Sequence, residues 1–142
     1  MEGEINQDGF TVYTLNGDEC RSLFKVKEEA IKNTFPIRNE GFAVALMTKS
    51  GNIYNGASYK SDTGNLTMHS EASALAHAAN HGETEIVAIT GPNCHACKQL
   101  IWESSIRSKI DTAIIINEGD KILQVPVSTL MPYPWPDKDM KK

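Results

Sequence analysis

The feature that most restricts the fold is the short connection between the last two apolar runs of the chain. Residues 113–116 are apolar and largely β-branched, which indicates a central, buried strand. Residues 122–127 form a second strand-like run, and Asn117-Glu118-Gly119-Asp120 between the two has the composition of a tight turn. A parallel pair of strands needs a crossover of about a dozen residues or more, so these strands are predicted to be antiparallel.

Upstream of this pair, helical and extended patterns alternate. In chain order they predict a short strand at 10–13, a helix at 18–33, a hairpin of strands at 42–48 and 53–58, a helix at 68–80, a strand at 86–90, a helix at 94–107 with Asn93 as its N-cap, and a helical turn at 128–131. Strands that alternate with helices imply a sheet covered on both faces, so the predicted class is α/β. The length predicts a single domain over residues 1–142.

Composition excludes several classes of function. The net charge is −4 and the pI is near 5.5, which predicts no binding to nucleic acid or to anionic membranes. No apolar run approaches the ~20 residues that cross a bilayer, and no apolar segment of a secretory signal follows the acidic start. Three cysteines favour a reducing compartment over a disulfide framework, so we expect a cytoplasmic protein. Cys20, outside the Cys94-x-x-Cys97 pair, is expected to be an ordinary half-buried helix residue.

Two short motifs carry the candidate chemistry. His69-Ser70-Glu71 begins one predicted helix, and Cys94 and Cys97 lie three residues apart on one face of the first turn of the next. The unpaired N–H groups of a helix start lower the pKa of a thiol. Two thiolates and one imidazole fill three positions around zinc and leave the fourth for water, which is typical of a catalytic site. Glu71 can then move protons without binding the metal.

Other interpretations of these residues remain open. A His-x-Glu triplet is weak by itself, and the chain contains a second one, His81-Gly82-Glu83. The two cysteines are also compatible with a redox pair, or with half of a structural zinc site. The fourth ligand of such a structural site would come from His77, His81 or His95.

The order H-x-E and then P-C-x-x-C resembles the signature of zinc-dependent nucleobase deaminases. Between about residues 42 and 135 the chain is most similar to the small cytidine deaminases and the related blasticidin S deaminases. The hairpin resembles the first two strands of the family, residues 98–103 resemble its C-R-Q-x-x-x-E, and Leu130-Met131-Pro132 resembles its L-L-P. The resemblance implies a three-layer α/β/α fold with a mixed five-stranded sheet whose last two strands are antiparallel.

The resemblance also implies a zinc ion on His69, Cys94 and Cys97, with Glu71 as the proton shuttle. Glu71 would take a proton from the attacking water, protonate the ring nitrogen and deliver a proton to the leaving ammonia. The implied activity is hydrolytic deamination of a cytosine-type ring in a small molecule, from cytidine-like or deoxycytidine-like to uridine-like. One alternative is a deaminase of a modified or conjugated aminopyrimidine such as blasticidin S, and a second is a non-catalytic zinc-stabilised binding domain.

The candidate substrate-binding residues depart from the family pattern. The family's strand-end Asn and Glu, which hold ribose, align with Ser58 and Lys60. Lys60 can meet an anionic group, a carboxylate or a phosphate, or lie solvated on the surface. Tyr133 and Trp135 can stack on a flat heterocycle, or their proline-rich segment can simply pack the C-terminus down. The resemblance implies a homo-oligomer, a dimer or a tetramer, in which this stacking crosses a subunit boundary.

Overall fold

The molecule is built on a five-stranded mixed sheet. The computed structural model describes residues 1–36 and 41–139. The strands of the sheet follow the order β4 (Ile53–Ala57), β3 (Ala43–Thr48), β5 (Ile86–Thr90), β6 (Ala113–Glu118) and β7 (Lys121–Pro126). Only β5 and β6 run parallel; the other neighbours are antiparallel. The predicted antiparallel arrangement of the last two strands is therefore confirmed.

One detail of the predicted sheet is wrong. β5 occupies the central position, whereas β6, expected there, lies beside it. β6 is nevertheless an interior strand, because β7 folds back along its outer side over a register that runs from Ala113–Pro126 to Glu118–Lys121. The first three residues of β6 are fully buried, which explains why its sequence resembles that of a central strand.

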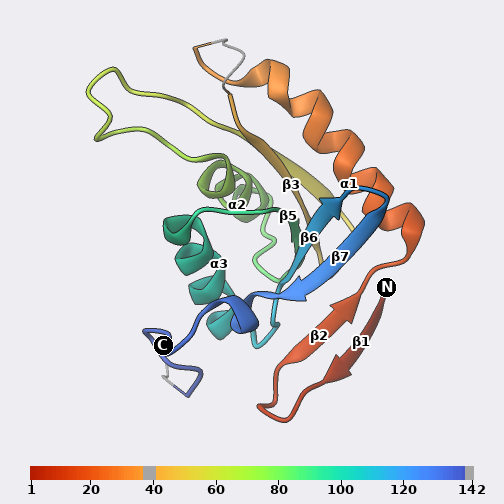
Figure 1. Ribbon diagram of the computed structural model, residues 1–142. Helices are drawn as coiled ribbons and strands as arrows, with labels where there is room; N and C mark the ends of the chain where they lie inside the picture. Colours follow the sequence, from red (N-terminus) through yellow and green to blue (C-terminus); the bar gives the residue numbers. More distant parts are fainter. Residues whose placement is uncertain (37–40, 140–142) are drawn as a thin grey trace.

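Helices cover both faces of the sheet (Figure 1). α1 (Gly17–Ala30) lies on one face, and α2 (Ser70–Asn80) and α3 (His95–Ser108) lie on the other. The side chains of β3 point alternately to the two faces of the sheet. Val44 and Leu46 join the core under α2 and α3, while Ala45 and Met47 join the core under α1. The three-layer α/β/α arrangement is thus confirmed. Among the described residues, no helix combines the length and apolar character that a membrane crossing requires.

The N-terminal segment and Cys20 differ from expectation. β1 (Glu2–Ile5) pairs antiparallel with β2 (Thr11–Thr14), so a hairpin forms where only one strand was predicted. All four residues of β1 are exposed, and the alternation that would reveal a half-buried strand is therefore missing. Cys20, expected to be half-buried, is 1% exposed because it shares the inner face of α1 with Leu23. Burial raises the pKa of its thiol.

The carboxylate of Glu83 joins the segment after α2 to the β3–β4 hairpin. Four side chains donate hydrogen bonds to it: Thr48 Oγ1 at 2.6 Å, Asn52 Nδ2 at 2.8 Å, Tyr54 Oη at 2.5 Å, and Ser50 Oγ. Hydrogen bonds to the charged form favour that form. They lower the pKa of Glu83 from its ordinary 4.5 to about 2, with the bonds from Ser50 and Thr48 contributing most.

We expect a Glu83→Gln variant to be less stable than the wild type at neutral pH, because an amide cannot accept all four bonds. The pKa of Glu83 is lower in the folded chain, so its stabilisation is present above 4.5 and is lost as the pH falls toward about 2. Urea unfolding of both proteins at several pH values will show their difference in stability shrinking as the pH falls from 4.5 toward about 2. A difference that does not change with pH would contradict this role.

Candidate metal centre and active site

His69 and Glu71 are positioned by the start of α2. His69 is the N-cap of this helix, with φ −70° and ψ 154°, and its carbonyl oxygen accepts a hydrogen bond from the Ser73 amide at 3.1 Å. β4 approaches the same turn very closely through Gly56. A Cβ atom at position 56 would lie 2.2 Å from the carbonyl oxygen of Ser70 and 2.3 Å from the amide nitrogen of Ala74. The missing side chain therefore allows strand and helix backbones to touch beside Glu71.

Cys94 and Cys97 are positioned by the start of α3. The predicted N-cap, Asn93, is wrong, because Cys94 occupies that position and its Sγ accepts from the Cys97 amide at 3.5 Å. The side chain of Asn93 is used elsewhere: its Nδ2 donates to Glu71 Oε2 at 2.7 Å and to the Thr90 carbonyl at 3.1 Å. The Cys94 sulfur thus caps α3, and the side-chain amide of Asn93 links the start of α3 to Glu71 at the start of α2.

The three predicted metal ligands converge on one point. His69 Nδ1 lies 3.2 Å from Cys97 Sγ and 3.5 Å from Cys94 Sγ, and the three ligand atoms lie within 4.8 Å of one another. A tetrahedral zinc ion, with bonds of about 2.0 Å to nitrogen and 2.3 Å to sulfur, places such ligands about 3.5 Å apart. Donor type and spacing therefore fit zinc.

His69, Cys94 and Cys97, called the metal group from here on, are open to solvent on one side. His69 and Cys94 are exposed and Cys97 is buried. Over residues 1–36 and 41–139 no fourth His, Cys, Asp or Glu joins these ligands, and His95 between the two cysteines is exposed. Three protein ligands with free space beside them are typical of a catalytic zinc site rather than a structural one.

The pKa of Cys97 departs from expectation. A helix start was expected to lower the pKa of its thiol, but burial raises it, and the contact with Cys94 and the nearby Glu71 carboxylate raise it further. The helix dipole is a small effect, and here the loss of water and the neighbouring negative charge are larger. A bound cation reverses this balance, because a thiol that coordinates a metal ion is deprotonated.

Glu71 lies beside the metal group without being part of it. Its side chain is buried, at 7% exposed. Oε1 accepts a hydrogen bond from Ser70 Oγ at 2.9 Å, and Oε2 accepts the bond from Asn93. Two donors thus fix the orientation of this carboxylate. Asn93 is a positioning residue that the sequence alone missed, since an asparagine before a helix is more simply interpreted as its cap.

A cavity of about 510 Å³ brings these groups together with two of the predicted substrate-binding residues. Ser58 and Lys60 line it, as their predicted roles require, although those roles remain predictions. Lys27, near the C-terminal end of α1, and Ile31, one helical turn later and just beyond that helix, also line it and were not anticipated from the sequence. The described residues that line it are Lys27, Ile31, Gly41, Phe42, Ala43, Val44, Ser58, Lys60, Thr67, His69, Ser70, Glu71, Thr90, Gly91, Pro92 and Cys94.

Tyr133 and Trp135 do not reach this cavity within one chain. Their side chains are 101% and 72% exposed, and neither lines the space beside Glu71. Their segment is held against α3, where Trp102 Nε1 donates to the Pro136 carbonyl and Gln99 Nε2 donates to the Trp135 carbonyl, both at 2.6 Å. Both residues therefore lie outside the lining of this cavity, and their stacking on a substrate, across a subunit boundary, remains a prediction.

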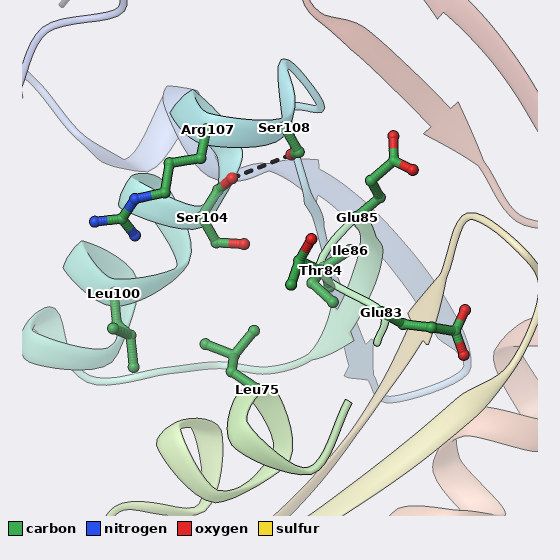
Figure 2. Close-up of a pocket in the computed structure, with 9 residues that line it drawn as sticks. All are labelled: Leu75, Glu83, Thr84, Glu85, Ile86, Leu100, Ser104, Arg107 and Ser108. Atoms are coloured by element: carbon green, nitrogen blue, oxygen red, sulfur yellow. Dashed lines mark hydrogen bonds between the residues drawn. The ribbon is translucent and has the colours of Figure 1, made fainter. Parts of the chain in front are cut away.

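A second cavity, of about 550 Å³, lies between α2, α3 and the start of β5 (Figure 2). Leu75 and Leu100 face it from the two helices, while Glu83 at its edge points away. Its lining includes neither a metal ligand nor Glu71. The second His-x-Glu triplet therefore supplies a structural carboxylate, whereas the first lies at the three converging metal ligands.

Comparison with known proteins agrees with this site. The family model for the cytidine and deoxycytidylate deaminase zinc-binding region matches residues 19–111. A curated cytidine deaminase from Halalkalibacterium halodurans is 31% identical over 106 residues, which cover 68% of this chain and 77% of that protein.

Solved structures show the same fold. The cytidine deaminase from Burkholderia pseudomallei matches with a TM-score of 0.69 at 22% identity, covering 81% of this chain and 98% of that one. The cytidine deaminase from Mycobacterium leprae matches with a TM-score of 0.65 at 20% identity, covering 84% of this chain and 99% of that one.

The convergent ligands, the sheet topology and the matched region together define a zinc-binding deaminase domain. The chain belongs to the cytidine deaminase family. It is accordingly a hydrolase that acts on a C–N bond, and the cofactor of the family, zinc, fits the three ligands found here.

Proposed function

We propose that this enzyme deaminates a cytosine-type ring in a small molecule, converting a cytidine-like or deoxycytidine-like substrate into its uridine-like product and ammonia. The observation that carries the proposal is that Glu71, His69 and Cys94 line one cavity of about 510 Å³. A volume of this size suits a single nucleoside-sized ligand. We further propose that residues 1–142 act as one catalytic domain, because the ligands come from both α2 and α3.

The proposed reaction is a hydrolysis that consumes one water molecule and releases one ammonia molecule. When bound at His69, Cys94 and Cys97, zinc supplies Lewis-acid activation of a water molecule. The water oxygen bonds to the ring carbon that carries the amine, and the bond from that carbon to the amine nitrogen breaks. The substrate and water become a uracil-type ring and ammonia.

Glu71 is proposed to move the protons of this reaction. Its carboxylate can accept a proton from the attacking water, pass one to the ring nitrogen and deliver one to the departing nitrogen. The hydrogen bonds from Ser70 and Asn93 hold it at the wall of the cavity, where it needs no rearrangement before each transfer. Preorganisation of this kind is what makes a single carboxylate an efficient shuttle.

A panel of aminopyrimidines tests the proposal. The zinc-loaded enzyme is incubated with cytidine, deoxycytidine, cytosine, cytidylate and blasticidin S, and deamination is followed by ultraviolet absorbance and ammonia release. We expect turnover of at least one nucleoside-sized member. A protein that carries zinc and deaminates none of them would contradict the proposed function.

A modified or conjugated aminopyrimidine such as blasticidin S is a second candidate substrate. Ser58 and Lys60 line the cavity in the positions where the family pattern places ribose-binding Asn and Glu. An ammonium group cannot accept hydrogen bonds from ribose hydroxyls as a carboxylate does. In the same panel, turnover of blasticidin S with little turnover of cytidine would select this candidate, and efficient turnover of cytidine would exclude it.

We also propose that the enzyme is a homo-oligomer, a dimer or a tetramer. Exposed apolar side chains border the metal group: Leu66 is 81% exposed, Met68 46% and Leu100 36%. Together with His69 and Cys97 they line a cavity of about 350 Å³. Apolar surface of this kind at a functional site is typical of an interface. Light scattering during size-exclusion chromatography will show a multiple of 15.6 kDa, and a monomer would contradict the proposal.

A further inference from the structure

Two lysines face the cavity that contains Glu71. Lys27 comes from α1 and Lys60 from the segment after β4, and both residues are half-buried. Among the described residues lining this cavity, they and Glu71 are the formally charged groups outside the metal group. None of the ion pairs formed within the described part of the chain includes either lysine.

The backbone around Lys60 is fixed rather than loose. The Lys60 amide donates to the Phe35 carbonyl at 2.8 Å, and Tyr59 forms bridges with both Phe35 and Met68. The ring of Tyr59 stacks on that of Phe35 with centroids 4.8 Å apart. Because side chains alternate along an extended segment, Ser58 and Lys60 face the cavity while Tyr59 is exposed.

Lys27 lines the same cavity from α1, the helix on the face of the sheet opposite to α2 and α3. Lys27 and Ile31 lie one turn apart on the same side of α1, at its C-terminal end and just beyond it, and both line the cavity. Lys25, two residues earlier, is exposed and lines no part of it. Both half-buried lysines line one cavity, and within the described part of the chain neither has a carboxylate partner, which favours an anion there.

We infer that Lys27 and Lys60 form an anion-binding subsite, and that the substrate is an aminopyrimidine whose substituent on the ring nitrogen carries a phosphate or carboxylate. The inference rests on the proposed function. In a cytosine ring the carbon that bears the amine and the substituted ring nitrogen lie on opposite sides. With the amine at Glu71 and the metal ligands, the substituent extends into the rest of the cavity, which the two lysines line.

Cytidine and two of its anionic 5′ derivatives test this subsite. The kcat/KM of the zinc-loaded enzyme is measured for cytidine, cytidine 5′-phosphate and cytidine 5′-carboxylate. We expect at least one anionic substrate to be preferred over cytidine by about tenfold or more, and this ratio to fall about tenfold in Lys27→Gln and in Lys60→Gln. The preferred anion identifies phosphate or carboxylate. Lys25→Gln, on the same helix, is the control and keeps the wild-type ratio.

Binding of the product provides a second readout. Calorimetry with uridine and uridine 5′-phosphate should show tighter binding of the anion, with an advantage that declines as salt is added. The subsite is overturned if cytidine is deaminated, or uridine bound, as well as or better than its anionic counterpart. It is also overturned if the kcat/KM ratio of anionic to neutral substrate is unchanged in both lysine variants. If the zinc-loaded enzyme deaminates nothing, the proposed function fails, and the calorimetric preference alone then decides whether the anion site exists.

Discussion

A Glu71→Gln enzyme is expected to lose about a thousandfold of its kcat while still holding about one zinc ion per chain. Glutamine has nearly the volume of glutamate, and its carbonyl oxygen can still accept a hydrogen bond from Ser70 or Asn93. It cannot accept and return a proton at neutral pH, so the shuttle is lost and the metal ligands are untouched. Ammonia release measures the turnover, and elemental analysis by mass spectrometry measures the zinc.

Glu85→Gln is the matched control for this experiment. Glu85 is an exposed carboxylate whose only ion pair in the described part of the chain is with Lys49 at 3.7 Å, and it lies outside the cavity that contains Glu71. The control should keep both zinc and turnover. Turnover near the wild-type level in Glu71→Gln would remove Glu71 from its proposed role.

The second large effect is expected from Cys97→Ala, which removes the buried member of the metal group. We expect bound zinc to fall from about one ion per chain to below about a tenth, because three protein ligands become two. Turnover should be lost with it. Added zinc should stabilise the wild type against unfolding by about 2.7 kcal/mol at a hundred times its Kd, and should leave the variant unchanged. Metal analysis and thermal unfolding with and without zinc provide the two measurements.

His95→Ala serves as the control for the cysteine variant. His95 lies between Cys94 and Cys97 in the sequence but is exposed and does not belong to the metal group. Its loss should leave zinc content and the zinc-dependent stabilisation intact. A Cys97→Ala protein that retains a full zinc ion, or a His95→Ala protein that loses it, would contradict the assigned ligand set.

The sheet and its layers could largely be predicted from local pattern. The tight turn after β6 determines the direction of β7, and alternation along β3 supplies side chains to both helical layers. β1 could not be found this way, because its four residues are all exposed and carry no alternating pattern. The position of β6 beside the centre depends on how strands far apart in sequence pair, which no local pattern records.

The metal ligands were predictable because two motifs at helix starts have recognisable residue types and spacing. The residues around them were not. Asn93 contacts Glu71 across 22 positions of the chain, and a local reading assigns it to the helix beside it. Lys27 lies on a helix far upstream in the sequence, and only the folded cavity places it with Lys60. Likewise, burial raises the pKa of the Cys97 thiol, although the helix dipole alone would lower it.

The close passage of β4 against α2 at Gly56 has a consequence for how this enzyme can change over generations. Any larger residue there would meet the backbone of α2 at Ser70 and Ala74, in the helical turn that contains Glu71. The helix would have to shift, and His69 at its start would shift with it. A single inherited substitution at a position that contributes no reacting atom would thus weaken folding and chemistry together, so we expect residue 56 to tolerate substitution as poorly as the ligands themselves.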